Sequence, residues 1–254
     1  MNPKQSKQER IEQAAELIRS SRHAVVLTGA GISTPSGIPD FRTQDTGLWS
    51  KDDPMEVASL SSFLRRPERF YAWLRPLLIQ TWEAKPNAAH FALAQMEAQG
   101  AIKAVITQNI DGLHKMAGSK NVIEVHGSLD HMECPTCHIM FPSENFKELM
   151  MEDTGLPRCP KCDRIVKPGI ILFEEFLPQG AWEAAEDHCS KADVVLVAGS
   201  SLVVMPVASL PYYTLRHGGK LIINTFSTTP LDDSAAVLLP YDVVEVVPAI
   251  GKAL

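Results

Sequence analysis

The sequence predicts an α/β protein with a doubly wound parallel sheet and a smaller inserted domain. Three observations lead to this prediction: short strands that are apolar throughout, helical stretches between them, and two interruptions of the alternation. Apolar strands that alternate with helices are typical of a parallel sheet covered on both faces. The chain of 254 residues is long enough for a large domain that carries an insertion.

The expected elements of the large domain follow one another regularly. Residues 7–20 form an amphipathic helix whose apolar side chains share one face. Further helices are expected at residues 88–99 and 179–190. Buried strands are expected at residues 24–28, 104–107, 122–125, 193–198, 220–224 and 243–247.

Two segments interrupt this alternation. Residues 41–85 are rich in aromatic side chains and helical in character, and residues 130–168 contain two Cys-x-x-Cys pairs. We expect them to form one small domain, a helical module plus a zinc-ribbon module. The large domain then comprises residues 1–40, 86–129 and 169–254. Ligands favour such domain interfaces and the carboxyl ends of parallel strands.

The two cysteine pairs predict a metal site. Cys134 and Cys137 are separated by 21 residues from Cys159 and Cys162. Each pair can present two thiolates to one ion, which predicts a tetrahedral zinc site without an open coordination position. Such a zinc is structural. The alternative is two unrelated disulfides or redox pairs. Cys189 lies in a helical stretch and is assigned no role.

Charge and hydropathy limit the partners. The formal net charge of −6 disfavours non-specific nucleic-acid binding and suits a basic partner such as a lysine-rich segment. No apolar run approaches the roughly 20 residues of a membrane helix, and residues 1–10 are polar. We expect a cytoplasmic protein that does not bind membranes. Without a dimerisation signal, a monomer is expected.

Glycine and small polar residues follow three of the expected strands. These turns are Gly-Ala-Gly at residues 29–31, Gly-Ser-Ser at 199–201 and Asn-Thr at 224–225. The first precedes an expected helix, a place where glycines allow a pyrophosphate to approach the backbone. Thr34 stands where the full dinucleotide fingerprint has a third glycine, so a turn without ligand stays open. Three such turns together favour one extended nucleotide.

Polar segments also stand at strand ends. Residues 37–42 combine a carboxylate, an aromatic ring and a guanidinium, residues 107–111 read Thr-Gln-Asn-Ile-Asp, and His126-Gly127 follows the strand at 122–125. Taken singly, they could be a turn residue, a helix N-cap and a hydrogen-bonded histidine. Their common place favours a site, in which His126 suits a general base because its ordinary pKa is close to working pH.

The chain resembles the sirtuin family of NAD-dependent protein deacylases, and most closely its bacterial and archaeal single-domain members. The resemblance spans about residues 20–247. It rests on seven motifs in the family's order: Gly29-Ala-Gly-Ile-Ser33, Gly37-Ile-Pro-Asp-Phe-Arg42, Thr107-Gln-Asn-Ile-Asp111, His126-Gly127, the four cysteines, Lys167-Pro-Gly-Ile-Ile-Leu-Phe173 and Gly199-Ser-Ser-Leu202.

The resemblance implies a set of site residues. His126 would be the general base, and Asn109 would assist it as a second catalytic residue. The implied NAD-binding residues are Ala30, Thr34, Asp40, Phe41, Arg42, Gln108, Asn109, Ile110, Asp111, Gly199, Ser200, Ser201, Asn224, Thr225 and Val243. The implied substrate-binding residues are Phe41, His126, Ile171, Phe173 and Glu175, and the implied zinc ligands are Cys134, Cys137, Cys159 and Cys162. The substrate backbone would pair with residues 174–176 and 203–205.

The implied partner is a protein or peptide that carries acetyl-lysine. The acyl oxygen attacks C1′ of the nicotinamide ribose, nicotinamide leaves, and His126 takes a proton from a ribose hydroxyl. The implied products are free lysine, nicotinamide and O-acetyl-ADP-ribose. Two alternatives use the same pocket: a mono-ADP-ribosyltransferase, or a non-enzymatic NAD-sensing module.

The sequence departs from the family pattern in two places. Glu174 stands where the family usually has glycine, which tolerates positive φ and close backbone approach better. Family members that prefer succinyl or malonyl groups have a Tyr-x-x-Arg pair. Here Leu74 follows Tyr71 at that spacing and Arg75 is one position late, about 100° around a helix. We therefore expect a preference for acetyl or other neutral acyl groups.

Overall fold

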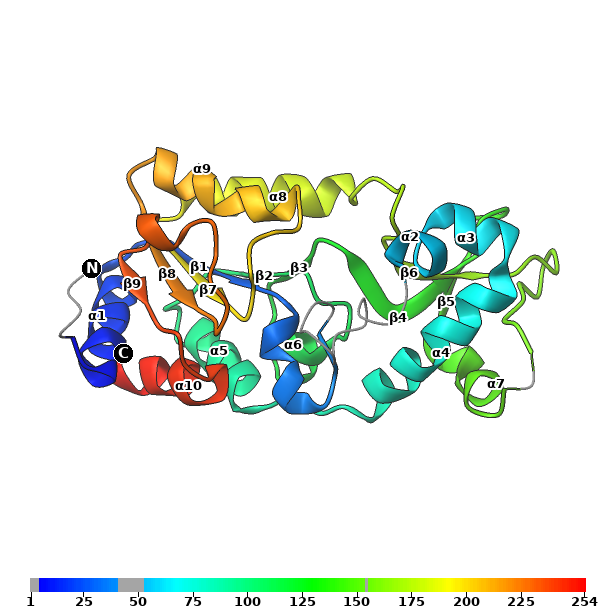
Figure 1. The fold of residues 1–254 in the computed structure, drawn as a ribbon, viewed down its shortest axis with the longest axis horizontal. Coiled ribbons are helices and arrows are strands. Elements are labelled where there is room, and N and C mark those ends of the chain that lie inside the picture. Colours follow the sequence, from blue (N-terminus) through cyan, green and yellow to red (C-terminus); the bar gives the residue numbers. More distant parts are fainter. Residues whose placement is uncertain (1–4, 41–52, 154) are drawn as a thin grey trace.

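The computed structural model describes residues 5–40, 53–153 and 155–254. The described chain contains two sheets (Figure 1). A six-stranded parallel sheet has the order β3-β2-β1-β7-β8-β9, and a three-stranded antiparallel sheet has the order β5-β4-β6. We call the first sheet with its helices the sheet lobe and the second sheet with its helices the zinc lobe. The two lobes lie at opposite ends of an elongated molecule.

The large sheet has its switch point in the centre. From β1 the chain adds β2 and β3 on one side, and then β7, β8 and β9 on the other. In this topology the crevice for a ligand lies at the carboxyl ends of the two strands where the direction reverses, here β1 and β7. The strands are β1 (Ala24–Thr28), β2 (Val105–Thr107), β3 (Val122–Glu124), β7 (Val194–Ala198), β8 (Lys220–Asn224) and β9 (Val237–Leu238).

Helices cover both faces of this sheet. Alternate residues of β1 point to opposite sides, so Val26 packs with α1, α5 and α10, whereas Val25 and Leu27 pack with α8 and α9. Figure 1 shows the first three helices below the sheet and the last two above it. Their bounds are α1 (Lys7–Ser20), α5 (Ala88–Ala98), α8 (Gln179–Lys191), α9 (Leu210–Arg216) and α10 (Val243–Ala253), and the short α6 (Leu113–Met116) follows β2. This arrangement confirms the doubly wound sheet.

The expected strand at residues 243–247 is wrong. This segment is the first half of helix α10, which begins at Val243 and is capped by Asp242, whose carboxylate accepts a hydrogen bond from Val244 N–H. Val243, Val246, Val247 and Ile250 are buried at helical spacing on one face. A run of valines reads as a strand in isolation, but this run belongs to a longer helical pattern. The short edge strand β9 was not expected.

The helix expected after residues 29–31 is also wrong. Two single 3₁₀ turns occupy this segment, at Ala30–Ile32 and Thr34–Ser36. Pro35 stands near the start of the second turn, and Gly37 ends it with a φ of 89°. Since proline lacks the N–H that a continuing helix needs, the two turns do not merge into an α-helix. Further 3₁₀ segments among the described residues are Ser143–Phe146, Val207–Ser209 and Asp232–Ser234.

The zinc lobe combines short strands with a helical cluster. Its strands are β4 (Gly127–Glu133), β5 (Met140–Pro142) and β6 (Lys167–Ile170), and its helices are α2 (Pro54–Val57), α3 (Leu60–Arg65), α4 (Pro67–Glu83) and α7 (Lys147–Met151). The rings of Phe63, Phe70 and Tyr71 meet edge to face in its core, with centroids 5.3 to 6.4 Å apart. Val125 and His126 connect β3 to β4, so the candidate base lies between the lobes.

None of the helices within residues 5–40, 53–153 and 155–254 combines the length and the apolar character required to traverse a bilayer.

Candidate active site

The three predicted turns meet at the carboxyl edge of the large sheet. Gly31 N–H donates to Gly199 O at 2.9 Å, and Gly199 N–H donates to Asn224 O at 2.9 Å. A Cβ on Gly31 would lie 2.8 Å from Gly199 O, and a Cβ on Gly199 would lie 2.2 Å from Ile32 N. The glycines are therefore required where one turn packs on the other. Ser201 continues the second turn.

A buried polar cluster lies beside these turns. Asn109 Nδ2 donates to Gly29 O at 3.1 Å and to Ser33 Oγ at 3.0 Å. Ser33 Oγ donates to Asp111 Oδ2 at 2.6 Å, and Leu113 N–H donates to Asp111 Oδ1 at 2.9 Å. Burial raises the pKa of Asp111, although these two hydrogen bonds lower it. Ser33 was not predicted as an individual site residue, but it connects the two predicted side chains.

His126 has one nitrogen fixed and one available. Its Nδ1 lies 3.0 Å from Gln108 O, and a carbonyl can only accept, so Nδ1 carries the proton and Nε2 is the basic atom. Burial lowers the pKa of His126 from 6.5, and the hydrogen bond to Gln108 raises it in part. The imidazole is therefore neutral at pH 7 and can accept a proton at Nε2.

Gln108 and Gly127 hold this histidine in place. Gln108 Nε2 donates to Ser200 Oγ at 2.8 Å, which connects the segment after β2 to the turn after β7. Gly127 has a φ of 73°, and a Cβ there would lie 2.1 Å from Gly169 O of β6. Glycine is therefore required directly after His126.

A recess with an empty volume of about 330 Å³ opens between the lobes. It combines apolar side chains with the amide of Asn109 and the carboxylate of Asp111. Its lining is Ala30, Ser33, Ile38, Pro39, Leu77, Thr81, Asn109, Ile110 and Asp111. Leu77 and Thr81 come from α4 of the zinc lobe, and no local sequence pattern predicts them as site residues. Ile38 and Pro39 belong to the motif at residues 37–42, in which the carboxylate, the aromatic ring and the guanidinium predict a site.

The residues expected on the adenosine side are less accessible. Asn224 is fully buried, and its Nδ2 donates to Leu239 O and Tyr241 O at 2.8 Å each. Val243 is buried at the start of α10. Thr225 is partly exposed and lines a second recess of about 390 Å³. Thr34 Oγ1 donates to Gly31 O at 3.1 Å. Asp40 ends the described segment, and Phe41 and Arg42 lie outside the described residues.

The residues expected to contact the substrate follow β6. Ile171 N–H donates to His126 O at 2.9 Å, and Phe173 exchanges backbone hydrogen bonds with Ala58 and Leu60 at 3.0 Å each. Glu175 is held inside the protein, because its Oε2 accepts from Lys167 Nζ at 2.9 Å and from Leu172 N–H at 2.8 Å.

The two departures from the family pattern have a structural counterpart. Glu174 has a φ of 75°, as expected where glycine usually stands, and its carboxylate accepts from Ser61 N–H at 2.9 Å and Ser61 Oγ at 3.0 Å. Tyr71 is fully buried and donates to Val166 O. Arg75 forms an ion pair with Asp153. Tyr71 and Arg75 are therefore engaged separately within the zinc lobe.

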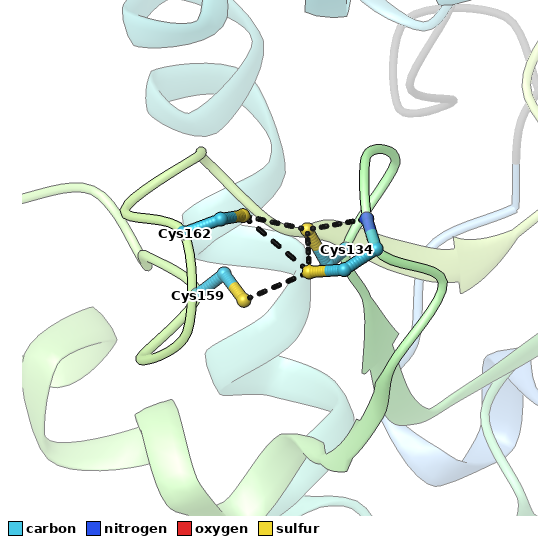
Figure 2. A group of neighbouring side chains, drawn as sticks. Cys134, Cys159 and Cys162 are labelled. Carbon is cyan, nitrogen blue, oxygen red and sulfur yellow. Dashed lines mark hydrogen bonds between the residues drawn. The ribbon is translucent and has the colours of Figure 1, made fainter.

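The four predicted cysteines lie together as free thiols. Figure 2 shows the sulfur atoms of Cys134, Cys159 and Cys162 gathered in one cluster, and all four sulfurs lie within 4.8 Å of one another. The shorter sulfur–sulfur distances are 3.3 to 3.5 Å. A tetrahedron with zinc–sulfur bonds of 2.3 Å has edges of about 3.8 Å. The cluster therefore fits one zinc ion held by four thiolates, and disulfides are not formed.

The two cysteine turns have the same shape. Cys134 N–H donates to Ile139 O and Cys159 N–H donates to Arg164 O, at 2.9 and 2.8 Å. In each turn the fourth residue after the first cysteine has positive φ: 54° at His138 and 59° at Asp163. Two equivalent turns that face each other are the arrangement a closed four-thiolate site requires.

Cys189 lies apart from this cluster. It is buried in α8 within the core of the sheet lobe, and burial raises its pKa to about 12. This position agrees with a packing role.

The chain belongs to the Sir2 family, whose model matches residues 29–206. It is 45% identical over 244 residues to NAD-dependent protein deacylase 2 of Archaeoglobus fulgidus, which covers 96% of this chain and 95% of the relative. It is 44% identical over 236 residues to an NAD-dependent protein deacetylase of Thermotoga maritima, covering 93% of this chain and 95% of the relative. A solved Sir2 complex with a deacetylated peptide and 3′-O-acetyl-ADP-ribose has a TM-score of 0.89 at 43% identity, covering 95% of this chain and 97% of that chain.

Proposed function

We propose that this protein is an NAD-dependent protein lysine deacetylase. It transfers the acetyl group of a modified lysine to ADP-ribose and releases nicotinamide and O-acetyl-ADP-ribose. The observation that carries this proposal is the state of His126: neutral, partly buried, fixed at Nδ1 by Gln108 O, and basic at Nε2. This imidazole adjoins the segment that also carries Asn109 and Asp111. Membership in the Sir2 family and the names of the relatives support the same activity.

In this proposal NAD supplies the ADP-ribose that accepts the acetyl group. Residues 199–201, Asn224, Thr225 and Val243 bind its adenosine half, and Ala30, Thr34, Asp40 to Arg42 and residues 108–111 bind its nicotinamide half. The Asn109–Ser33–Asp111 cluster orients that half, because its members hold one another with hydrogen bonds of 2.6 to 3.0 Å. His126 accepts a proton from a ribose hydroxyl at Nε2, while the hydrogen bond from Nδ1 to Gln108 O stabilises the resulting cation.

The proposed substrate is a protein or peptide with acetyl-lysine. Phe41, His126, Ile171 and Phe173 line the lysine path, Glu175 supports it, and the peptide backbone is added as a strand between residues 174–176 and 203–205. The acyl group is neutral, because Tyr71 and Arg75 are engaged by Val166 and Asp153 and leave no counter-charge.

The zinc bound by the four cysteines is structural and braces the small domain, which comprises residues 41–85 and 130–168. The Rossmann-like domain comprises residues 1–40, 86–129 and 169–254. We further propose a cytoplasmic monomer that binds neither membranes nor nucleic acids directly.

The test incubates the protein with NAD and an acetyl-lysine peptide and follows both by mass spectrometry. Deacetylated peptide and O-acetyl-ADP-ribose are expected, and His126→Ala should reduce kcat by at least about a hundredfold. The matched control is His217→Ala, because the His217 imidazole also hydrogen-bonds a backbone carbonyl but lies exposed after α9. ADP-ribose added to protein would identify a transferase instead, and unconsumed NAD would identify a sensor.

A further inference from the structure

Two buried histidines lie behind the site and have no part in the proposed chemistry. His90 of α5 is fully buried and His114 of α6 is 2% exposed. Their ring centroids are 4.8 Å apart. Burial lowers their pKa values to about 4 and about 3, so both are neutral at pH 7. Neutral imidazole has one donor nitrogen and one acceptor nitrogen, so two such rings can join a hydrogen-bond chain of defined direction.

One end of such a chain is fixed by the start of α5. Asn87 N–H donates to His90 Nδ1 at 3.3 Å as part of the helix cap. Because a backbone N–H can only donate, Nδ1 of His90 is the acceptor and its Nε2 carries the hydrogen. His90 Nε2 has no hydrogen-bond partner among the described residues. A buried N–H without an acceptor costs about 1 to 3 kcal/mol, so this nitrogen requires a partner.

The other unsatisfied nitrogen of the pair is the candidate partner. His114 Nδ1 is likewise buried without a partner among the described residues. If one buried water accepts from His90 Nε2–H and donates to His114 Nδ1, both groups are satisfied. His114 then carries its hydrogen on Nε2, which lies 2.9 Å from Thr28 Oγ1.

The far end of this hydrogen-bond chain reaches the segment at residues 107–111, which carries Asn109 and Asp111. Thr28 Oγ1 accepts from His114 and donates to Thr107 Oγ1 at 2.8 Å. Thr107 Oγ1 also accepts from Asn109 N–H at 3.0 Å. The donor-to-acceptor direction set by Asn87 N–H is thus compatible with every contact as far as Asn109. The backbone N–H of Asn109, like that of Asn87, can only donate.

The same helix start also holds the opposite side of the recess. Asn87 Nδ2 donates to Ile32 O at 2.8 Å and to Ser36 Oγ at 3.0 Å. Asn87 therefore fixes the turns that contain Ser33, while His90 leads through the chain to Asn109. Ser33 and Asn109 are themselves hydrogen-bonded at 3.0 Å.

We propose that His90 and His114 are positioning residues, which with Thr28 and Thr107 form a buried hydrogen-bond chain of fixed direction that orients Asn109. Both imidazoles carry their hydrogen on Nε2. The chain makes no contact with substrate; it sets the backbone of Asn109, which in turn aims the Asn109 amide at Ser33. The consequence for catalysis rests on the proposed function, whereas the tautomers of the two rings do not.

The first test reads the tautomers directly. Protein with ¹⁵N-labelled histidine is studied at pH 7.5 by long-range ¹H–¹⁵N correlation, with signals assigned from the His90→Asn, His114→Gln and His126→Asn variants. His90 and His114 should both be protonated at Nε2 alone. His126 is an internal contrast, since its bond to Gln108 O requires hydrogen on Nδ1. A proton on Nδ1 of His90 or His114, or a doubly protonated ring, would overturn the proposal whether or not the protein deacetylates peptides.

The second test compares two substitutions of His114. His114→Gln keeps a donor near the position of Nε2, whereas His114→Phe keeps only the ring. We expect His114→Phe to reduce kcat by about tenfold to a hundredfold with KM for the peptide within about twofold, and His114→Gln to recover most of that loss. Wild-type kcat in a folded His114→Phe protein would contradict the proposal, and so would equal losses in the two variants. Circular dichroism verifies folding.

The matched control is the second histidine pair of the molecule. His23 Nε2 lies 3.1 Å from His188 Nδ1, next to the amino end of β1. His188→Phe should leave kcat unchanged, because this pair is at the opposite edge of the sheet. A loss equal to that of His114→Phe would show that disrupting any histidine pair lowers activity, and would contradict a positioning role.

Discussion

The sheet lobe and the zinc lobe differ in what holds each together. The sheet lobe has a parallel sheet between two apolar clusters, and the five residues of β1 and of β7 are all buried. The zinc lobe has three short antiparallel strands, and four thiols lie beside its aromatic cluster. Each lobe has an apolar core, and we expect the second lobe to depend on a metal in addition. The proposed chemistry belongs to the first.

The recess nevertheless needs both lobes. Asn109 and Asp111 come from the segment after β2, whereas Leu77 and Thr81 come from α4 of the zinc lobe. We therefore expect the metal to act at a distance, by keeping α4 in place. Four changes test how far the contributions of the two lobes to activity and stability can be distinguished.

Loss of the metal should have the largest effect. In Cys162→Ser, or after chelation, we expect the zinc lobe to unfold and deacetylation to fall below detection, because a structural zinc contributes to folding directly. Zinc analysis, limited proteolysis and turnover measure this, and the separate chain segments that form the sheet lobe should stay protected while the zinc lobe is cleaved. Cys189→Ala is the control, since this buried thiol lies in the core of the sheet lobe. A zinc-free protein that kept full activity would contradict the dependence of the zinc lobe on the metal.

Low pH should reduce activity first by protonating His126, which follows β3 of the sheet lobe. Burial lowers the pKa of His126 below 6.5, and the base must be neutral to accept a proton. Activity should thus stay level as pH falls to 6.5 and decline below it, about tenfold per pH unit once the base is mostly protonated. The profile of kcat/KM from pH 5 to 9 measures this, with circular dichroism at each pH to exclude unfolding. An acid limb above pH 7 would contradict a lowered pKa.

The acyl group tests what the zinc lobe contributes to specificity. With Tyr71 and Arg75 engaged elsewhere, a succinyl carboxylate would enter without a counter-charge. We expect kcat/KM for a succinyl-lysine peptide to be at least about tenfold below that of the acetyl peptide, equivalent to about 1.4 kcal/mol. A propionyl-lysine peptide serves as the neutral control for size. Equal turnover of the succinyl and acetyl peptides would refute this assignment.

The smallest effect is expected at Glu174. A non-glycine residue at positive φ costs roughly 1 to 2 kcal/mol, and the two hydrogen bonds from Ser61 offset this. Glu174→Gly should change the free energy of unfolding by less than about 1 kcal/mol, because strain and hydrogen bonds disappear together. Glu174→Ala keeps the strain and loses the bonds, so it should be less stable than Glu174→Gly by about 1 kcal/mol. Urea denaturation compares the two, and equal stability would exclude the strain.

The sequence predicted those features that depend on local pattern. Apolar strands, glycine turns and paired cysteines each show their role within a few residues, and the doubly wound sheet and the cysteine cluster are confirmed. The strand prediction for residues 243–247 was wrong because valines favour strands. The helical pattern shows only when the spacing of apolar residues as far as Ile250 is considered. Contacts between distant segments gave no local signal. Leu77 and Thr81 line the recess only because α4 packs there, and His90 meets His114 only through the fold.

The most direct test of the account is a crystal structure of the protein with NAD and an acetyl-lysine peptide. The account predicts that Nε2 of His126 lies within hydrogen-bond distance of a ribose hydroxyl, with Nδ1 still on Gln108 O and Asn109 beside the same ribose. A His126 ring turned away from the sugar, or a ribose bound outside the recess, would contradict it.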